Sequence, residues 1–237
     1  MEWLKKTRLL LGDEKLNKLK NSEVLVVGLG GVGGAAAEML CRAGIGNMTI
    51  ADGDVVEETN RNRQIPALTS TTGKPKAGVM AERLRDINPE INLNVVNDFI
   101  CDKKTTELIN SRSFDYVVDA IDTLSPKVYL IYECLQKNLN IVSSMGAGGK
   151  TDPSQIQITD ISKSYNCKLA KVIRKRLSRL GVKTGVKVVF SSEKIDKNAV
   201  QEEEGPNKKS TVGTISYMPS VFGCFAASVV IRSLTER

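Results

Sequence analysis

The sequence predicts an α/β fold: a doubly wound, mostly parallel Rossmann-like sheet with an N-terminal helical arm. Short apolar runs alternate along the chain with longer segments of helical periodicity, which is typical of parallel strands joined by right-handed helical crossovers. The first clear apolar run, residues 24–27, leads directly into a cluster of glycines and then into a helix. No internal repeat or linker interrupts the 237 residues, so we expect one domain.

The first half of the chain gives an arm and three strand–helix units. Leucines and charges within residues 1–22 predict short helices at residues 4–11 and 13–19. Alanine-rich residues 32–43 predict a helix closed by Gly44, and Pro75 and Pro89 bound a helical segment between them. Strands are expected where the apolar runs fall, at residues 24–27, 48–51 and 93–96.

The second half continues the alternation. Asp102 precedes a predicted helix at residues 103–110, and Ser125-Pro126 begins another that ends near Asn138. The strands expected here lie at residues 116–120, 141–144, 156–161 and 186–190. Polar residues 191–211 predict a mobile loop. A closing helix begins at Pro219, and its apolar run, residues 221–231, is too short to span a bilayer, so we expect a buried helix and no membrane insertion.

The composition excludes several classes of chemistry. The chain contains no histidine, which rules out Ser–His and Cys–His nucleophilic catalysis. Its five cysteines are scattered without a C-x-x-C pair, which argues against a structural zinc site and favours a reducing compartment. Residues 1–20 mix charge and leucine at close intervals, unlike a secretory signal. We therefore expect a cytoplasmic protein.

The net charge of +7 comes from one segment, residues 161–187, which has no acidic residue. Apolar residues recur at helical spacing from Leu169, at Val172, Ile173, Leu177 and Leu180, and predict one buried helix face. The basic side chains then lie largely on the remaining surface. This pattern indicates either an anionic partner or a solvated helix kept soluble by its charge. The nine basic residues are Lys163, Lys168, Lys171, Arg174, Lys175, Arg176, Arg179, Lys183 and Lys187.

The glycine cluster predicts a phosphate-binding turn. Gly28, Gly30, Gly31 and Gly33 stand between a strand and a helix, where the backbone can approach phosphate and the helix N-terminus favours negative charge. Asp52 follows 19 residues after Gly33, at the end of the second strand, where a carboxylate can bond ribose hydroxyls. These features by themselves are typical of an NAD site.

Cations further along favour ATP over NAD. Asp54, Asn60 and Arg63 lie in the loop after the second strand, and Lys76 begins the next helix. Hydride transfer has no use for two cations at this place, whereas a triphosphate undergoing cleavage is stabilised by Arg and Lys. Asp119 and Asp122 stand at the end of a strand, where a carboxylate beside a triphosphate is a natural Mg²⁺ ligand.

In order and spacing, these residues resemble the ThiF-like adenylating core of the ubiquitin-activating-like superfamily. The resemblance covers nearly the whole chain and includes Asn60-x-x-Arg63-Gln64. It implies a single adenylating domain over residues 1–237 that uses ATP and Mg²⁺. It further implies that Asp52 holds the ribose, and that Arg63 and Lys76 hold the phosphates. Asn60 would lie near the reacting phosphorus and Asp122 would bind the metal.

The resemblance also implies an assembly. In the superfamily an arginine of the N-terminal arm completes the ATP site of a partner subunit, and Arg8, before Leu9-Leu10-Leu11-Gly12, matches it. A homodimer is therefore expected. Some relatives form thioesters on a cysteine of the crossover region, so Cys167 is a candidate, although a buried apolar cysteine is the commoner case.

Two further segments resemble the tRNA threonylcarbamoyladenosine dehydratases more narrowly. They are the run Gly146-Ala147-Gly148-Gly149 with the residues up to Pro153, and the basic stretch around Arg174-Lys175-Arg176. Those enzymes use ATP to activate the threonyl carboxylate of a modified adenosine beside the anticodon, after which the side chain closes into a ring. The resemblance implies tRNA as partner, bound by residues 163–187.

Three other functions stay open at this point. The first is adenylation of a ubiquitin-like sulfur-carrier protein, which uses the same ATP residues and would bring a sulfur-transfer protein as partner. The second is a nucleotide-dependent adaptor without catalysis, disfavoured by the full set of phosphate-binding residues. The third is an NAD oxidoreductase, disfavoured by Arg63 and Lys76.

Overall fold

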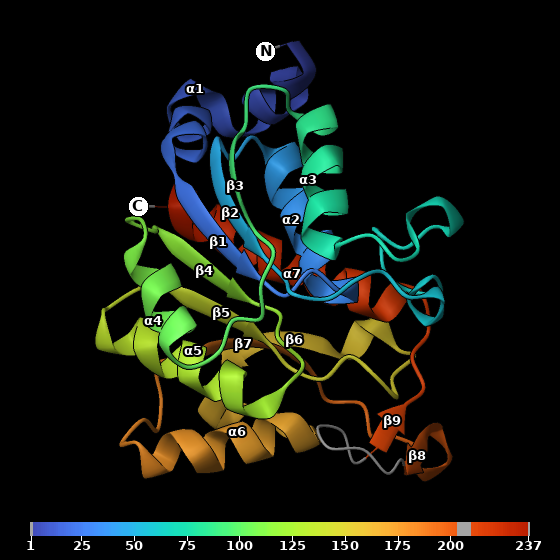
Figure 1. Cartoon of the computed structure of the whole chain (residues 1–237). Coiled ribbons are helices and arrows are strands. Elements are labelled where there is room, and N and C mark those ends of the chain that lie inside the picture. The colour runs from blue at the N-terminus through green and yellow to red at the C-terminus, as the bar shows by residue number, and fades with distance from the viewer. Residues whose placement is uncertain (1, 203–209, 237) are drawn as a thin grey trace.

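A seven-stranded sheet forms the centre of the protein, with the strand order β3-β2-β1-β4-β5-β7-β6. The computed structural model describes residues 2–202 and 210–236 (Figure 1). All neighbouring strands are parallel except β6, which pairs antiparallel with β7 at one edge. The strands are β1 (Glu23–Val27), β2 (Asn47–Ala51), β3 (Asn92–Val96), β4 (Tyr116–Asp119), β5 (Ile141–Ser144), β6 (Ile156–Asp160) and β7 (Lys187–Ser191). The predicted doubly wound, mostly parallel sheet is confirmed.

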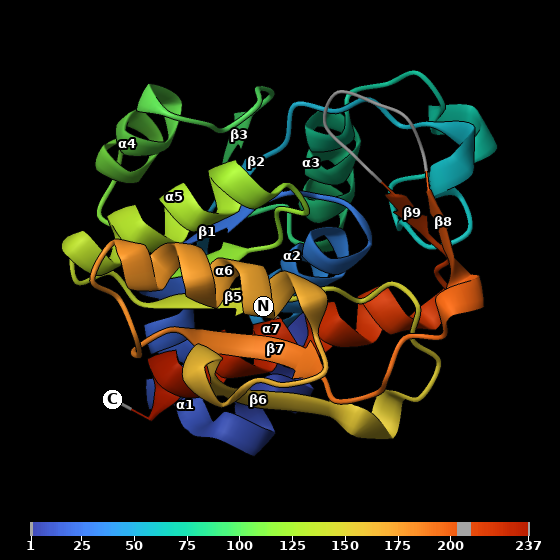
Figure 2. The ribbon, with the colours of Figure 1, turned by 90° about the horizontal axis from the view of Figure 1, so that it is seen from below.

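Helices cover both faces of this sheet, as Figures 1 and 2 show. Alternate residues of each strand point to opposite faces, so Val24 and Val26 pack with one helix layer while Leu25 and Val27 pack with the other. The first layer contains α2 (Gly31–Ala43), α3 (Lys76–Ile87) and α7 (Tyr217–Thr235). The second contains α4 (Lys103–Asn110), α5 (Leu124–Gln136) and α6 (Lys168–Arg179).

The predicted helical arm is confirmed as one element with a break. Helix α1 (Lys5–Asn21) has non-helical backbone at Gly12, whose φ is 80°. Leu4 and Leu16 from the two sides of this break are buried and lie beside Gly44, at the C-terminus of α2. Leu9 and Leu10 between them are 87% and 83% exposed. The arm is therefore fixed at its base and presents apolar side chains outward.

Helix α7 is a core element, as predicted. Among the described residues it is the helix long and apolar enough to cross a membrane, and 56% of the residues in its most apolar window are buried inside the protein. It packs closely on α2 at Gly223, where an added Cβ would contact the Val32 carbonyl oxygen and lie 2.8 Å from the Ala35 Cβ.

Two sequence predictions need correction. The stretch 191–211 is not simply a loop: β8 (Val200–Glu202) and β9 (Ser210–Val212) pair antiparallel in a separate two-stranded sheet, which satisfies their backbone hydrogen-bonding groups. Residues 203–209 of that stretch lie outside the described residues. The buried face of α6 is Ala170, Ile173 and Leu177, whereas Val172 and Leu180 are 40% and 47% exposed.

The close packing of α2 on α7 predicts a sharp difference between two glycines. Gly223→Ala should lower the free energy of unfolding by about 1–3 kcal/mol, because the new methyl group overpacks the contact with Val32. Gly78→Ala in α3 is the matched control, since no atom lies within 4 Å of its added Cβ, and should stabilise by up to about 1 kcal/mol. Urea unfolding of both variants measures this, and equal effects would contradict the packing argument.

Candidate active site

The glycine turn after β1 brings three strand ends together. Gly28 has φ +87° and its N–H donates to the Ala51 carbonyl at the end of β2, 2.8 Å away. An added Cβ on Gly28 would lie 2.7 Å from the Ala120 carbonyl oxygen, just after β4. A Cβ on Gly33, in the first turn of α2, would overlap the Gly28 carbonyl oxygen. Only glycine allows this approach, which places the turn where the strand order reverses between β1 and β4.

Gly31, the first residue of α2, is also closely covered by other parts of the chain. A Cβ on Gly31 would lie 2.7 Å from Cβ of Pro219, in α7, and 3.0 Å from the Arg63 carbonyl oxygen. Gly30 has ordinary space, with the Gln64 side chain at 3.6 Å. The loop after β2 therefore folds back over the N-terminus of α2, whose first N–H groups have no partner within the helix.

Asp52 ties this turn to the loop after β2. One carboxylate oxygen accepts from the Leu29 N–H at 2.6 Å, and the other accepts from the Asp54 N–H at 2.8 Å. Burial raises the pKa of Asp52, while the two backbone N–H groups act in the opposite direction. The carboxylate thus stands at the end of β2 beside the glycine turn, as the sequence predicted.

Lys76 is buried beside the same loop. It is the first residue of α3 and is 6% exposed, and its ammonium lies 2.9 Å from the Asp54 carboxylate. Its backbone N–H also donates to the Asp54 carbonyl, at 2.9 Å. These two contacts with Asp54 orient Lys76. The lysine side chain is buried, whereas the Asp54 side chain is half exposed.

The segment from Asn60 to Gln64 forms a tight turn over Gly31. Asn60 is buried, its carboxamide oxygen accepts from the Glu57 N–H at 3.2 Å, and its carbonyl accepts from the N–H groups of Arg63 and Gln64. The Arg63 guanidinium donates to the Thr59 carbonyl at 3.0 Å and is partly exposed. Within residues 2–202 and 210–236, the buried Gln64 carboxamide oxygen has no hydrogen-bond partner. Such an acceptor is available to a donor from outside the chain, either a water molecule or a ligand group.

Asp119, the last residue of β4, and Asp122, three residues further on, have different environments. Asp119 is fully buried: its carboxylate lies 2.8 Å from the Lys127 ammonium and accepts from the Ser143 hydroxyl at 2.6 Å. It is therefore part of the scaffold and not a metal ligand. Asp122 is exposed just beyond the same strand end.

Lys127 is a residue that sequence reasoning missed. Its ammonium is fully buried and also donates to the Ile121 carbonyl at 2.9 Å, while the Ile121 N–H donates to Asp119 at 3.1 Å. The ion pair thus fixes both sides of the Ile121 residue that precedes Asp122. A single lysine within the apolar stretch 127–131 was the available signal.

Phe99 was also missed. It is 63% exposed, and its ring lies 2.8 Å from where a Cβ on Gly53 would stand, beside Asp52. An exposed aromatic ring after β3 is difficult to distinguish from an ordinary surface residue in sequence alone.

Arg8 lies away from these residues in its own chain. Its guanidinium is 3.2 Å from the Asp13 carboxylate, on the arm that packs beside Gly44. Gly44 and the glycine turn are at opposite ends of α2, whose 13 residues span about 20 Å. The structure therefore does not bring Arg8 to the Arg63 site within one chain.

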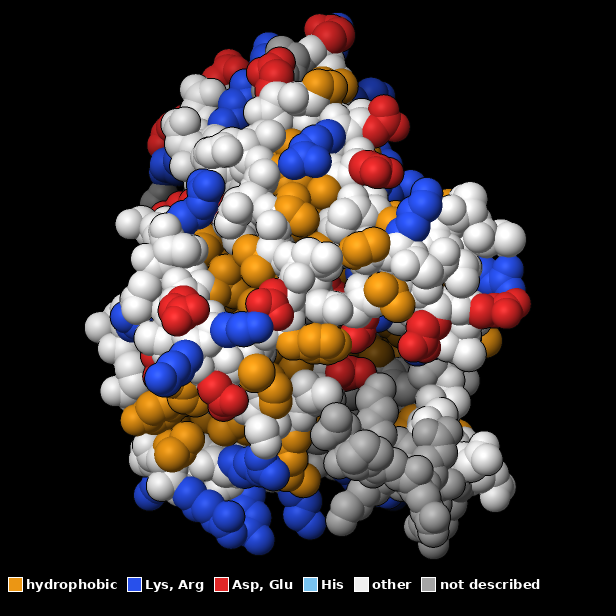
Figure 3. Space-filling model, viewed as in Figure 1, with side chains coloured by type: hydrophobic (Ala, Val, Ile, Leu, Met, Phe, Trp, Pro, Cys, Tyr) orange, Lys and Arg blue, Asp and Glu red, His pale blue; other side chains and the backbone are white. Residues whose placement is uncertain are grey.

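Most of the basic segment is available at the surface. Figure 3 shows Lys and Arg side chains gathered over α6 along the lower edge of the view. Arg174 is an exception, since its guanidinium donates to the Ser164 carbonyl at 2.8 Å, and Arg176 donates to the Ser125 hydroxyl at 2.8 Å. The exposed members are Lys163, Lys168, Lys171, Lys175, Arg179, Lys183 and Lys187.

Cys167 is 6% exposed and packs in the apolar cluster beneath α6. This burial is the environment of a core cysteine. Nearby Lys150 is 1% exposed, and burial lowers the pKa of its ammonium.

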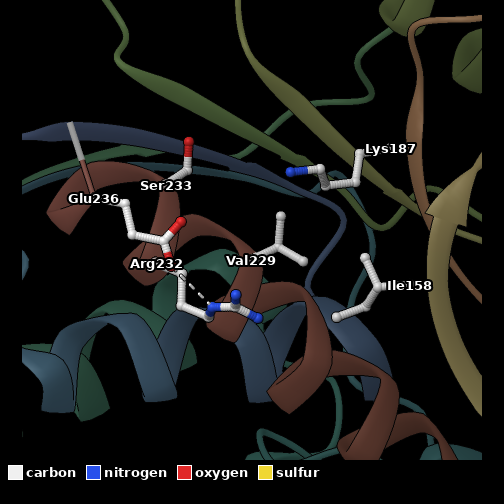
Figure 4. Close-up of a pocket in the computed structure, with 6 residues that line it drawn as sticks. All are labelled: Ile158, Lys187, Val229, Arg232, Ser233 and Glu236. Carbon is white, nitrogen blue, oxygen red and sulfur yellow. Dashed lines mark hydrogen bonds and ion pairs between the residues drawn. The ribbon is translucent and has the colours of Figure 1, made fainter.

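A separate pocket lies toward the amino ends of the parallel strands, where β7 begins and α7 ends (Figure 4). It is lined by Ile158, Lys187, Val229, Arg232, Ser233 and Glu236. None of these residues belongs to the glycine-turn site. Gly28, Asp52 and Asp122 follow the carboxyl ends of their strands, on the opposite side of the sheet from this pocket.

Comparison with known proteins places this geometry in a family. The model of the ThiF family matches residues 4–237. The chain is 41% identical to the tRNA threonylcarbamoyladenosine dehydratase of Bacillus subtilis (strain 168), over 98% of this chain and 94% of that protein. The crystal structure of E. coli tRNA N6-threonylcarbamoyladenosine dehydratase in complex with ATP superimposes with a TM-score of 0.91 at 38% identity, covering 99% and 94% of the two chains. A molybdopterin-synthase adenylyltransferase of Haemophilus influenzae is 36% identical over only 53% of this chain and 51% of its own length.

Proposed function

The chain belongs to the ThiF family, and we propose that it is an ATP-dependent tRNA threonylcarbamoyladenosine dehydratase. It adenylates the threonyl carboxylate of threonylcarbamoyladenosine in tRNA and drives its cyclisation, a dehydration, through an acyl-adenylate. The observation that carries this proposal is the similarity to proteins of that name over nearly the full length of both chains. Three adenylyltransferase relatives match only 53% to 63% of the chain, which disfavours the alternative of a sulfur-carrier substrate with its sulfur-transfer partner.

The chemistry fits a protein without histidine. The substrate carboxylate is ionised at neutral pH, so it attacks the α-phosphorus of ATP without a general base and releases pyrophosphate. An internal nucleophile of the modified side chain then attacks the activated carbonyl carbon, loses its proton and expels AMP. What this chain must supply is positioning and positive charge rather than proton transfer.

We assign the residues by where they stand around the glycine turn. Gly28, Gly30, Gly31 and Gly33 form the phosphate-binding turn. Asp52 binds the ribose, and its partner Asp54 orients Lys76 toward the phosphates. Arg63 holds phosphate from the other side, and Asn60 shapes the turn that carries it. The unpaired Gln64 acceptor supports a ligand at this place.

Asp122 is the proposed ligand of Mg²⁺. In the described parts of the chain no group of three acidic, cysteine or histidine side chains is arranged to hold a metal. This agrees with Mg²⁺, which is usually held by one or two carboxylates together with substrate phosphates and water. The ion would supply charge neutralisation at the phosphates when bound.

We further propose that the protein is a single-domain cytoplasmic enzyme that acts as a homodimer. All five cysteines are free thiols, which suits a reducing compartment. Leu9 and Leu10 are exposed on the arm that carries Arg8, and a second copy of the chain would cover them while Arg8 completes its ATP site.

The assignment of Lys76 and Arg63 to the phosphates predicts that the protein prefers ATP over NAD and that loss of either cation slows the reaction. Lys76→Ala or Arg63→Ala should slow tRNA-dependent ATP–pyrophosphate exchange by about 10²–10³-fold, because each removes a positioned cation. Lys74→Ala, two residues away and exposed, is the matched control and should keep the parent rate. Calorimetry should show binding of ATP–Mg²⁺. Tight binding of NAD without binding of ATP would contradict the assignment.

The shared site predicts complementation between defective subunits. Neither Arg8→Ala nor Arg63→Ala homodimers should adenylate at the parent rate, but a mixture should recover part of the activity. Each mixed dimer assembles one intact site, from the Arg8 of one subunit and the Arg63 of the other. Differently tagged subunits verify exchange. Proven exchange with no recovery would show that Arg8 acts elsewhere.

The exposed face of α6 predicts a salt-dependent tRNA contact. Lys171→Ala, Lys175→Ala and Arg179→Ala combined should weaken tRNA binding and reduce the slope of log K against log salt by up to about 0.9 per lost phosphate contact. Affinity for ATP should stay unchanged. Arg174 is left intact because its contacts with Ser164 are structural.

A control triple variant removes equal charge elsewhere: Arg85→Ala, Lys103→Ala and Lys137→Ala, all exposed on other elements. It should bind tRNA with the parent slope. If both triple variants behave alike, the α6 face acts only through net charge, and tRNA contacts another surface.

A further inference from the structure

Tyr165 is an exposed aromatic residue inside the basic segment, and the proposed adenylation chemistry does not use it. Half of its surface (50%) is open to solvent, in the stretch between β6 and α6. Single exposed apolar residues are common on proteins, so exposure alone carries little weight. The contacts that hold this ring and its position in the fold are stronger evidence of a function.

The ring is anchored at both ends. The ring forms a T-shaped contact with the fully buried Phe190, with ring centroids 5.5 Å apart and planes at 70°. Its hydroxyl accepts from the Gln157 carboxamide at 3.3 Å. The next residue, Asn166, has φ +52°, and its carboxamide donates to the Ser192 carbonyl at 2.9 Å. The exposed ring is thus ordered in advance, which reduces the entropy lost when a ligand stacks on it.

Tyr165 lies at the carboxyl ends of the parallel strands, as the glycine turn does. Gln157 pairs with Phe190 at the carboxyl end of β7, and Ser192 follows that strand. A chain of contacts continues toward the nucleotide site: the Glu193 carboxylate accepts from the Thr151 N–H at 3.0 Å, and the Tyr217 hydroxyl donates to the Thr151 carbonyl at 2.7 Å. Tyr217 begins α7, whose Pro219 covers Gly31.

Charge completes the surface. Lys163 and Lys168 flank Tyr165 in sequence and are exposed, as is Lys171 one turn into α6. Residues 161–187 contain no acidic side chain. An ordered aromatic ring among cations is what proteins use to bind single-stranded nucleic acid, where unpaired bases stack and the backbone lies along the positive charge. Double-helical RNA offers no such base face, because its bases are stacked within the helix.

We propose that Tyr165 is a stacking platform for an unpaired base of the tRNA loop, next to the nucleotide that is adenylated. This inference rests on the proposed function and deepens it: Tyr165 contacts the single-stranded part of the substrate, while the exposed cations along α6 contact phosphates. Tyr165 is a binding residue and takes no part in the chemical steps.

The first test measures binding of an RNA hairpin that carries threonylcarbamoyladenosine in its loop. Tyr165→Ala should weaken binding about tenfold, as loss of one base–aromatic stack does, whereas Tyr165→Phe should keep most of the affinity because the ring remains. Leu180→Ala, an exposed apolar truncation at the other end of α6, is the matched control and should bind like the parent. Equal losses in Tyr165→Phe and Tyr165→Ala would overturn the proposal, since they would indicate a role for the hydroxyl anchor instead.

The second test reads stacking directly, without depending on the stability of the alanine variant. The chain has one tryptophan, Trp3, so Tyr165→Trp in a Trp3→Phe background gives a single reporter ring. Its fluorescence should be quenched by the loop hairpin but not by a fully paired RNA duplex of equal length. Quenching by the duplex alone, or by neither RNA while the protein binds the hairpin, would overturn the inference.

Tests on the parent enzyme separate this inference from the proposed function. A parent that supports pyrophosphate exchange with the modified hairpin, together with a Tyr165→Ala variant of undiminished affinity, overturns the stacking proposal alone. A parent that binds no RNA and instead supports exchange with a carrier protein overturns both. Raised KM for the hairpin with unchanged kcat in Tyr165→Ala is the kinetic result expected from a residue that only binds.

Discussion

The site depends on one steric constraint, the contact of backbone with backbone where β1 and β4 diverge. Gly28 and Gly33 have no room for a Cβ, because the Ala120 and Gly28 carbonyl oxygens occupy that space. This approach opens the N-terminus of α2 toward the crevice between the two strands. Asp52 then reaches the Leu29 N–H, and the loop carrying Arg63 closes over Gly31. Without the first contact, none of these side chains would converge.

Charges are divided between those that build the site and those that remain for ligands. Asp119 and Lys127 are both fully buried and satisfy each other, so they fix the turn before Asp122 and are not accessible to a substrate. Lys76 is buried but its partner Asp54 is half exposed, which leaves that pair open to competition from an anionic ligand. The Arg63 guanidinium donates to the Thr59 carbonyl and to the Asn62 carboxamide oxygen, and within residues 2–202 and 210–236 it pairs with no carboxylate. Such a division suits a reaction catalysed by fixed positive charge.

The same division explains how the surface can hold two anionic substrates. We assign ATP to the crevice at the carboxyl ends of β1, β2 and β4, where the Lys76 ammonium is buried and lies beside the Asp54 carboxylate. The tRNA is assigned to α6 and the segment before it, where several lysines are exposed and the half-exposed Tyr165 ring is held by Phe190 and Gln157. Both surfaces lie on the side of the sheet where the parallel strands end, because β7 is parallel to β1 through β5.

The sequence by itself determined the alternation of strands and helices, the glycine turn and the order of Asp52, Arg63, Lys76 and Asp122, because periodicity and local backbone requirements are properties of short segments. Only the tertiary structure decided which charges are buried. Asp119 and Asp122 look alike in sequence, but Ser143 of β5 and Lys127 of α5 enclose the first. Arg174 is likewise held at the Ser164 carbonyl, whereas its neighbour Lys175 is exposed. Burial is set by neighbours distant in the chain, and no local pattern specifies which side of an element they will cover.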